Sequence, residues 1–152
     1  MSNLNSVFDT LRGWPDGSSL EKSFTPKSGD TYAEGAIVKT NTDGSGGTHV
    51  EALSSAVKAG NPYDDAWIVI QGNDQYDAAF VNKVTCLKLM SGTTVKVQTD
   101  IADTLAIGDM ISANAGVLEK TVAGAGMKYP VGLVIESNGV SGSGGWIKMV
   151  SL

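Results

Sequence analysis

The sequence predicts an all-β protein, and three observations lead to that prediction. Short runs rich in Val, Ile and Thr alternate with Gly and Asn clusters, as expected for strands joined by tight turns. The 19 glycines among 152 residues exceed the ordinary share of about 7%, which favours turns over helices. No amphipathic helical period is convincing, although residues 76–81 could form one turn. We therefore expect about nine strands and no substantial helix.

The first thirty residues are expected to form an extended N-terminal arm. Pro15 and Pro26, two of the four prolines, interrupt any periodic pattern together with the glycines that flank them. The segment is too apolar for stable disorder, so it should lie along a partner or, alternatively, fold back on its own domain. The candidate partner-binding residues of this arm are Leu4, Phe8, Leu11, Trp14, Leu20 and Phe24.

Residues 31–152 are expected to form one β-domain. Residues 35–40 and 48–53 flank a glycine-rich loop, a pattern that predicts a hairpin. Residues 66–70 are apolar without interruption, which predicts a central strand covered on both faces. A second hairpin is expected around Ser91–Gly92, with Val95 and Val97 of its second strand facing the core.

Four further strands are expected in the last third, and small-residue turns separate them. The first two are joined by a turn at Asn114–Gly116. No residue in this region looks placed for chemistry, so the region favours presentation of a surface over catalysis. The four expected strands are residues 110–113, 117–121, 130–136 and 146–150.

Composition and charge exclude several classes of partner. The net charge of −5 offers no basic field to a phosphate backbone, which disfavours DNA and RNA as direct partners. No apolar run approaches the ~18 residues of a membrane span, and no export signal is evident. The single cysteine, Cys86, is expected in the core, where the apolar phase shifts at Leu87 and indicates a bulge or a doubly covered strand.

The residues that could carry chemistry give weak patterns. His49 could act with Ser54 or Ser55 in a small hydrolase, but no Gly-x-Ser-x-Gly elbow exposes either serine. A calcium site is another reading of the acidic and amide residues around the 66–71 strand, although their spacing does not match a calcium loop and favours a solvated rim. Those residues are Asp64, Asp65, Asn73, Asp74 and Asp77.

A third chemical reading concerns Lys128. The run Ala125–Tyr129 resembles the Ala-Met-Lys-Met hairpin that carries biotin in biotinyl domains. Tyr129 stands where the second methionine would be, and Pro130 follows at once. A loop that packs Met127 and Tyr129 is the favoured interpretation, with a prosthetic-group carrier as the alternative.

Three motifs in the last third point to a known family. The first is Gly108-Asp109 within Leu105–Ile111, directly before an expected strand. The second, Pro130-Val131-Gly132, begins another strand, and the third, Gly145–Val150, is the last expected strand. In this organisation, roughly from Ala36 to Leu152, the chain resembles the head decoration (cement) proteins of tailed bacteriophages. The resemblance implies a small antiparallel β-barrel or β-tulip that would span residues 31–152, outside which the N-terminal arm extends.

The same resemblance implies a function. It implies a protein that is not an enzyme, holds no cofactor or metal, and binds the major capsid protein on the outer surface of the phage head. It also implies self-association, often as a trimer, that clamps neighbouring capsomers against the pressure of packaged DNA. The expected location is the virion, with assembly in the host cytoplasm. A tail or baseplate component of a virion is the alternative in the same class.

Overall fold

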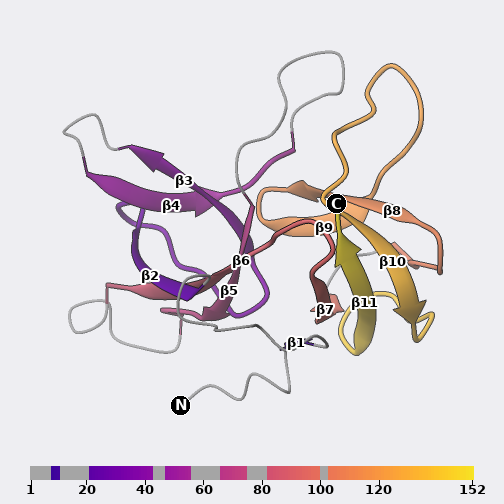
Figure 1. Ribbon diagram of the computed structural model, residues 1–152, viewed down its shortest axis with the longest axis horizontal. Helices are drawn as coiled ribbons and strands as arrows, with labels where there is room; N and C mark the ends of the chain where they lie inside the picture. Colours follow the sequence, from indigo (N-terminus) through magenta and orange to yellow (C-terminus); the bar gives the residue numbers. More distant parts are fainter. Residues whose placement is uncertain (1–7, 11–20, 43–46, 56–65, 75–81, 100–102) are drawn as a thin grey trace.

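The computed structural model describes residues 8–10, 21–42, 47–55, 66–74, 82–99 and 103–152. Within these ranges it contains eleven strands and no helix, which confirms the predicted all-β class. The strands form two groups, a closed barrel and a six-stranded sheet, which lie side by side (Figure 1).

The barrel is built from five consecutive strands between residues 21 and 88. They are β2 (Glu21–Pro26), β3 (Ile37–Thr42), β4 (Thr48–Ala52), β5 (Trp67–Gln71) and β6 (Val84–Lys88). They close in the order β2-β4-β3-β5-β6, and β6 pairs with β2. The barrel is confirmed, but it is not wholly antiparallel, because β2 runs parallel to β4.

The six-stranded sheet takes almost all its strands from the second half. It contains β1 (Phe8–Thr10), β7 (Thr94–Thr99), β8 (Met110–Asn114), β9 (Val117–Lys120), β10 (Gly132–Ser137) and β11 (Gly145–Ser151). Its order is β1-β7-β11-β10-β8-β9, and all its pairs are antiparallel. The outermost strands of this sheet are therefore β1 and β9.

The nine strands expected after residue 31 are all present, and the two additional ones, β1 and β2, lie in the expected arm. Strand β2 corrects that expectation for residues 21–26, since it closes the barrel by pairing with both β6 and β4. Pro26 is the last residue of this strand, and the N–H that follows it, that of Lys27, donates to the Val50 C=O at 2.8 Å. The barrel therefore begins at Glu21 rather than after residue 30.

The expected hairpin at Ser91–Gly92 is wrong. A turn does form there, in which Thr93 N–H donates to Met90 C=O at 2.9 Å. However, β6 pairs with β2 and β5 in the barrel, whereas β7 pairs with β1 and β11 in the sheet. The turn thus carries the chain from one group of strands to the other.

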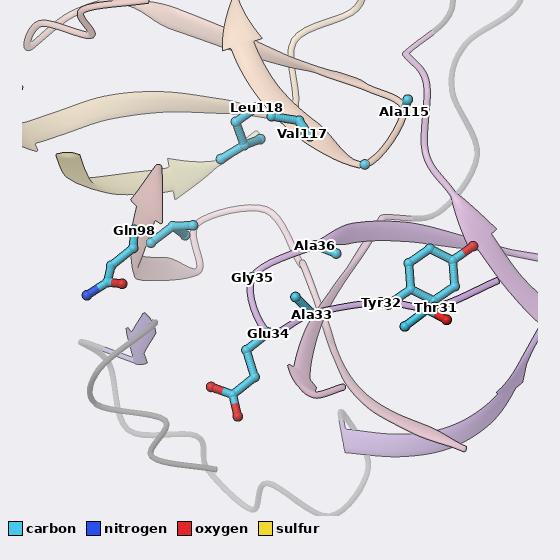
Figure 2. Close-up of a pocket in the computed structure, with 12 residues that line it drawn as sticks. Thr31, Tyr32, Ala33, Glu34, Gly35, Ala36, Gln98, Ala115, Val117 and Leu118 are labelled. Carbon is cyan, nitrogen blue, oxygen red and sulfur yellow. The ribbon is translucent and has the colours of Figure 1, made fainter. Parts of the chain in front are cut away.

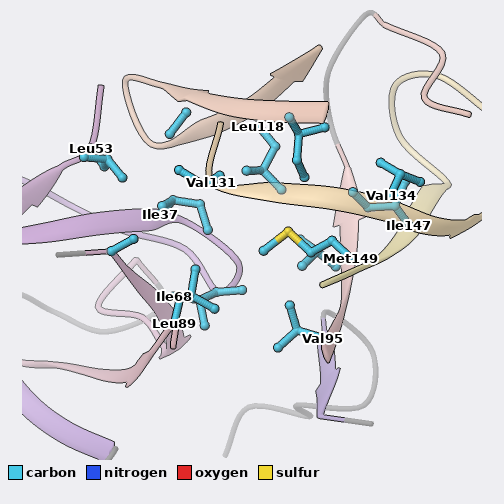
Figure 3. Close-up of a cluster of buried hydrophobic side chains, with 14 of the residues drawn as sticks. Ile37, Leu53, Ile68, Leu89, Val95, Leu118, Val131, Val134, Ile147 and Met149 are labelled. Atoms are coloured by element: carbon cyan, nitrogen blue, oxygen red, sulfur yellow. The ribbon is translucent and has the colours of Figure 1, made fainter. Parts of the chain in front are cut away.

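Two apolar clusters explain why the strands alternate as they do. One fills the barrel and contains Tyr32, Val38, Val50, Trp67, Val69, Val84 and Cys86. The other lies between barrel and sheet (Figure 3), where Ile37, Ile68 and Leu87 meet residues such as Ile111, Ile147 and Met149. Successive residues of β5 and β6 enter different clusters, so both strands are covered on both faces, as the sequence predicts. The barrel and the sheet share one core.

The turn between β8 and β9 fastens the two groups together. Ile37 N–H donates to Gly116 C=O, and Gly116 N–H donates to Leu53 C=O, both at 2.9 Å. Ala115 and Gly116 have φ values of 48° and 83°. Positive φ at both central residues is what a two-residue hairpin loop with a type I′ turn requires. A Cβ on Gly116 would stand 3.3 Å from the Ile37 carbonyl oxygen, so glycine permits both the turn and the close approach.

Candidate functional site: an apolar end of the six-stranded sheet

The serines proposed for hydrolysis serve the joint between barrel and sheet. Ser55 Oγ accepts a hydrogen bond from Ala113 N–H, and Ser54 Oγ accepts one from Ala115 N–H, each at 2.9 Å. His49 Nε2 lies 3.7 Å from Glu51 Oε2. Among the described residues, no contact joins His49 to either serine, so the expected pairing of nucleophile and base is not assembled there.

Lys128 and Cys86 have structural surroundings. Lys128 Nζ lies 2.6 Å from Glu119 Oε1 and is half-buried, unlike the freely projecting lysine that a swinging prosthetic group requires. Cys86 is buried inside the barrel, as expected. Burial raises the pKa of its thiol to about 12, which keeps it in the unreactive thiol form.

The residues read as a calcium set are only partly described. Asn73 is buried and accepts a hydrogen bond from Tyr32 N–H at 2.8 Å, so it orders the segment that follows β2. Asp74 is exposed, and Asp64, Asp65 and Asp77 lie outside the described residues. No group of three metal-ligating side chains occurs in the described part of the chain.

Of the six residues expected to bind a partner through the arm, the structure describes two, Phe8 and Phe24. Phe24 packs against the cluster inside the barrel, with its ring edge-on to Trp67 and ring centroids 4.9 Å apart. Phe24 is half-buried in this contact, and its role in binding a partner stays a prediction. Phe8 lies on β1, where it pairs with Val97 through the backbone. Leu4, Leu11, Trp14 and Leu20 lie outside the described residues.

Exposed apolar side chains gather instead at one end of the six-stranded sheet. Ile107 and Val122 are each 72% exposed, and Met110 and Ile135 are 41% and 42% exposed. Backbone hydrogen bonds hold these four residues at the same end: Gly108 N–H donates to Val134 C=O, and Thr121 N–H donates to Met110 C=O, both at 2.8 Å. We call Ile107, Met110, Val122 and Ile135 the apolar end.

A latched turn holds the most exposed part of the apolar end in place. Asp109 N–H donates to Ala106 C=O at 3.1 Å across the turn, and Gly108 occupies its third position with φ 91°, as a type II turn requires. The Asp109 carboxylate accepts a hydrogen bond from Ala106 N–H at 2.9 Å and pairs with Lys120 Nζ at 2.9 Å. These two bonds lower the pKa of Asp109.

Ile107 occupies the second position of this turn, outside the strands, and its side chain is 72% exposed. Its main chain is fixed by the Asp109 latch, so burying its side chain against a partner would cost little ordering of the backbone. The apolar end is therefore a preorganised surface, suited to binding rather than to bond chemistry.

Sequence reasoning passed over the apolar end. The sequence motif around Gly108-Asp109 was noted for its resemblance to a family, whereas the apolar residue in front of it was not. An isoleucine directly before a glycine in a turn is a signal that could have marked it, because turn positions are normally exposed. Ile135 carried no such signal, since it protrudes where the register between β10 and β11 shifts.

No helix long and apolar enough to cross a membrane occurs in the described ranges. No protein-family model matches this chain, and the search of curated proteins gave no match either.

Proposed function

We propose that this chain is a structural, non-enzymatic protein that decorates the outer surface of a tailed-bacteriophage head. The observation that carries a binding role is the apolar end, four exposed apolar side chains on a latched rim of the sheet. Exposed apolar clusters of this kind mark surfaces that another protein covers. The resemblance to cement proteins supplies the identity of the partner, the major capsid protein.

The three motifs behind that resemblance are neighbours in space. The Gly108-Asp109 motif opens β8, the Pro130-Val131-Gly132 motif opens β10, and the closing motif forms β11. These strands adjoin one another in the sheet order. The residues that suggested the family therefore build the same part of the molecule that exposes the apolar end, which supports a shared role in binding.

The binding energy available from this surface is adequate for a multivalent clamp. Complete burial of a large aliphatic side chain contributes about 1.5–3 kcal/mol, so Ile107 and Val122 together offer several kcal/mol. If the chain acts as a homotrimer, three such surfaces engage together, and effective concentration raises avidity about 10²–10⁴-fold. Modest single contacts then suffice to hold the protein on a shell.

The proposal is tested by sedimentation of purified protein with phage heads that lack it. The variant Ile107→Ser with Val122→Ser should bind heads at least about tenfold more weakly, since each 1.4 kcal/mol corresponds to a factor of ten. Val117→Ser is the matched control, because Val117 is 47% exposed and begins β9, at the opposite end of this strand from Val122; it should bind as the unmodified chain does.

Two outcomes would contradict the proposal. The unmodified protein would fail to sediment with heads, or gold-labelled antibody would mark the tail or baseplate instead of the head. Light scattering of the purified chain, with an expected mass three times that of the monomer, checks the trimer independently.

A further inference from the structure

A groove opens between the barrel and the six-stranded sheet, at the opposite end of β9 from the apolar end. Its volume is about 320 Å³, within the lower range of small-molecule sites. One wall is the segment of residues 31–36 that leads into β3, and the other combines residues 115–118 at the β8–β9 turn with Val97 and Gln98 of β7. Figure 2 shows Glu34 on the barrel side of the groove and Gln98 on the sheet side.

The main chain beside the groove is already hydrogen-bonded within the fold. Ile37 N–H donates to Gly116 C=O, and Gly116 N–H donates to Leu53 C=O. Leu118 is only 4% exposed, so β9 offers no open strand edge at this point. A ligand in the groove must therefore be held by side chains rather than by pairing with a strand.

Two polar side chains in the walls have hydrogen-bonding capacity to spare. Glu34 lines the groove and is half-buried as a whole. Its Oε1 atom is buried, and within the described part of the chain no group donates a hydrogen bond to it. The Gln98 side chain is exposed, and its carboxamide makes no hydrogen bond to another described residue. The two walls thus present a carboxylate and an amide oxygen that both lack a donor.

The charge at Glu34 favours a cation as the donor. Burial raises the pKa of Glu34, and the negative charge of Asp74 raises it further. Among the described side chains, no lysine or histidine forms an ion pair with Glu34. An ammonium or guanidinium group carries several donors on one positive charge. Placed against Glu34, such a group would satisfy the carboxylate and relieve the repulsion between the two acids.

The rest of the walls suits a small apolar body. Ala33, Ala36, Ala115 and Val117 all line the groove. These side chains offer methyl groups and no further hydrogen-bonding atoms, so a ligand gains there only by removing apolar surface from water. Small sites that combine apolar walls with a few polar groups select ligands of the same kind, with one polar head and an apolar remainder.

We propose that this groove binds a small organic cation, namely a primary ammonium or guanidinium group on a short aliphatic chain. The cationic head lies against the Glu34 carboxylate, and Gln98 offers a second acceptor from the opposite wall. The aliphatic chain contacts Ala33 and Val117. This site goes beyond the proposed capsid contact, because it lies at the other end of β9 and uses no residue of the apolar end.

The test titrates the complete chain, labelled with ¹⁵N, with 1-butylamine at pH 7 and constant ionic strength. The amine should shift the amide signals of residues 31–36, 97–98 and 115–118, with a Kd of about 1–10 mM because so small a ligand has few atoms to contribute. 1-Butanol has the same aliphatic chain without the charge, and it should bind about tenfold more weakly or worse.

Glu34→Gln keeps the shape of the side chain but removes its charge, and it should weaken binding of 1-butylamine about tenfold. The variant should fold normally, because Glu34 forms no hydrogen bond or ion pair with another described residue. Gln98→Ala should have a smaller effect, about threefold, because it removes a neutral acceptor. Glu136→Gln is the matched control, since Glu136 pairs with Lys148 outside the groove; it should bind the amine as the unmodified chain does.

The proposal is overturned if 1-butylamine shifts no signals at tens of millimolar, if it shifts signals elsewhere, or if Glu34→Gln binds it unchanged. Equal binding of 1-butanol would also overturn it, because the acid would then select nothing. Sedimentation with phage heads tests the proposed function separately. A Glu34→Gln chain that loses the amine but keeps the heads supports both proposals, whereas an unmodified chain that binds heads but no amine removes only the cation site.

Discussion

The barrel and the six-stranded sheet differ in what they leave open to a partner. Every barrel strand has two neighbouring strands. The interior of the barrel is filled by a cluster of buried side chains that includes Tyr32, Trp67 and Cys86. The sheet has two edges. Except for Met90, all exposed large apolar side chains of the described residues lie in the strands of the sheet or in the segments next to them: Ile107, Met110, Val117, Val122, Ile135, Val140 and Leu152. Closure removes the free strand edges with which a partner could pair, whereas the sheet keeps two outermost strands, β1 and β9.

The same comparison shows that the barrel is a support for the sheet. One face of β3, β5 and β6 lines the barrel, while the other contributes Ile37, Ile68 and Leu87 to the core shared with the sheet. The β8–β9 turn adds backbone hydrogen bonds between the two groups. A rigid base of this kind limits the entropy lost when the exposed rim of the sheet meets a partner.

The largest effect on stability is expected from removing a side chain from the core that the barrel and the sheet share. Ile68 is fully buried on β5, and Ile68→Ala should lower the free energy of unfolding by about 3 kcal/mol through lost transfer energy and the cavity that remains. Denaturant titration gives this value. Amide hydrogen exchange should show β6 and β10 losing protection together, because both depend on this core.

Ile107→Ala is the control for that change, since an exposed side chain should alter stability by less than about 0.5 kcal/mol. If Ile68→Ala released only the barrel amides and left β10 protected, the shared core would not couple the two groups, and the comparison would have to treat them as separate domains.

A smaller effect is expected at the joint. Gly116→Ala should cost about 2 kcal/mol, because alanine strains the positive φ and its Cβ crowds the Ile37 carbonyl at 3.3 Å. Gly108→Ala is a matched control, with φ 91° and open space around the added Cβ. It should cost only about 1 kcal/mol. Equal losses in thermal or denaturant unfolding would show that the joint is not tightly packed.

The smallest effect concerns the latch at the apolar end. The pKa of Asp109 is lowered in the folded chain, so its bonds stabilise the fold above the unfolded pKa of about 3.9 and are lost as pH falls through the folded pKa. Asp109→Asn should lower stability at pH 7 by about 1 kcal/mol or less, because Lys120 is solvent-exposed. The variant should also lose less stability than the unmodified chain between pH 5 and acid conditions, as followed by denaturant titration. A variant with unchanged acid sensitivity would contradict the latch.

Local pattern predicted individual strands well, because alternation and turn chemistry act over a few residues. The β3–β4 and β8–β9 hairpins form as expected, since each strand's partner is its neighbour in sequence. The Ser91–Gly92 turn shows the limit of that reasoning. The residues encode a reversal of the chain, but β6 and β7 find better partners in strands far along the sequence.

The candidate sites were less predictable for the same reason. The contact between Phe24 and Trp67 joins residues 43 positions apart, and no local pattern around Phe24 predicts it. The apolar end requires Ile107, Val122 and Ile135 to converge from three separate loops and strands. The segment before β3 and the β8–β9 turn line one pocket although they are about 80 residues apart in the chain. None of these neighbours can be identified from spacing along the chain.

By itself, the sequence determined that this protein is built from short strands, that β5 is covered on both faces, and that Cys86 is internal. Those features depend on periodicity and composition, which each segment carries alone. Only the tertiary structure decided which strands close into a barrel, which remain at an edge, and which apolar side chains stay exposed. Strand pairing between distant segments is chosen by the total burial of the folded chain, and no single segment contains that information.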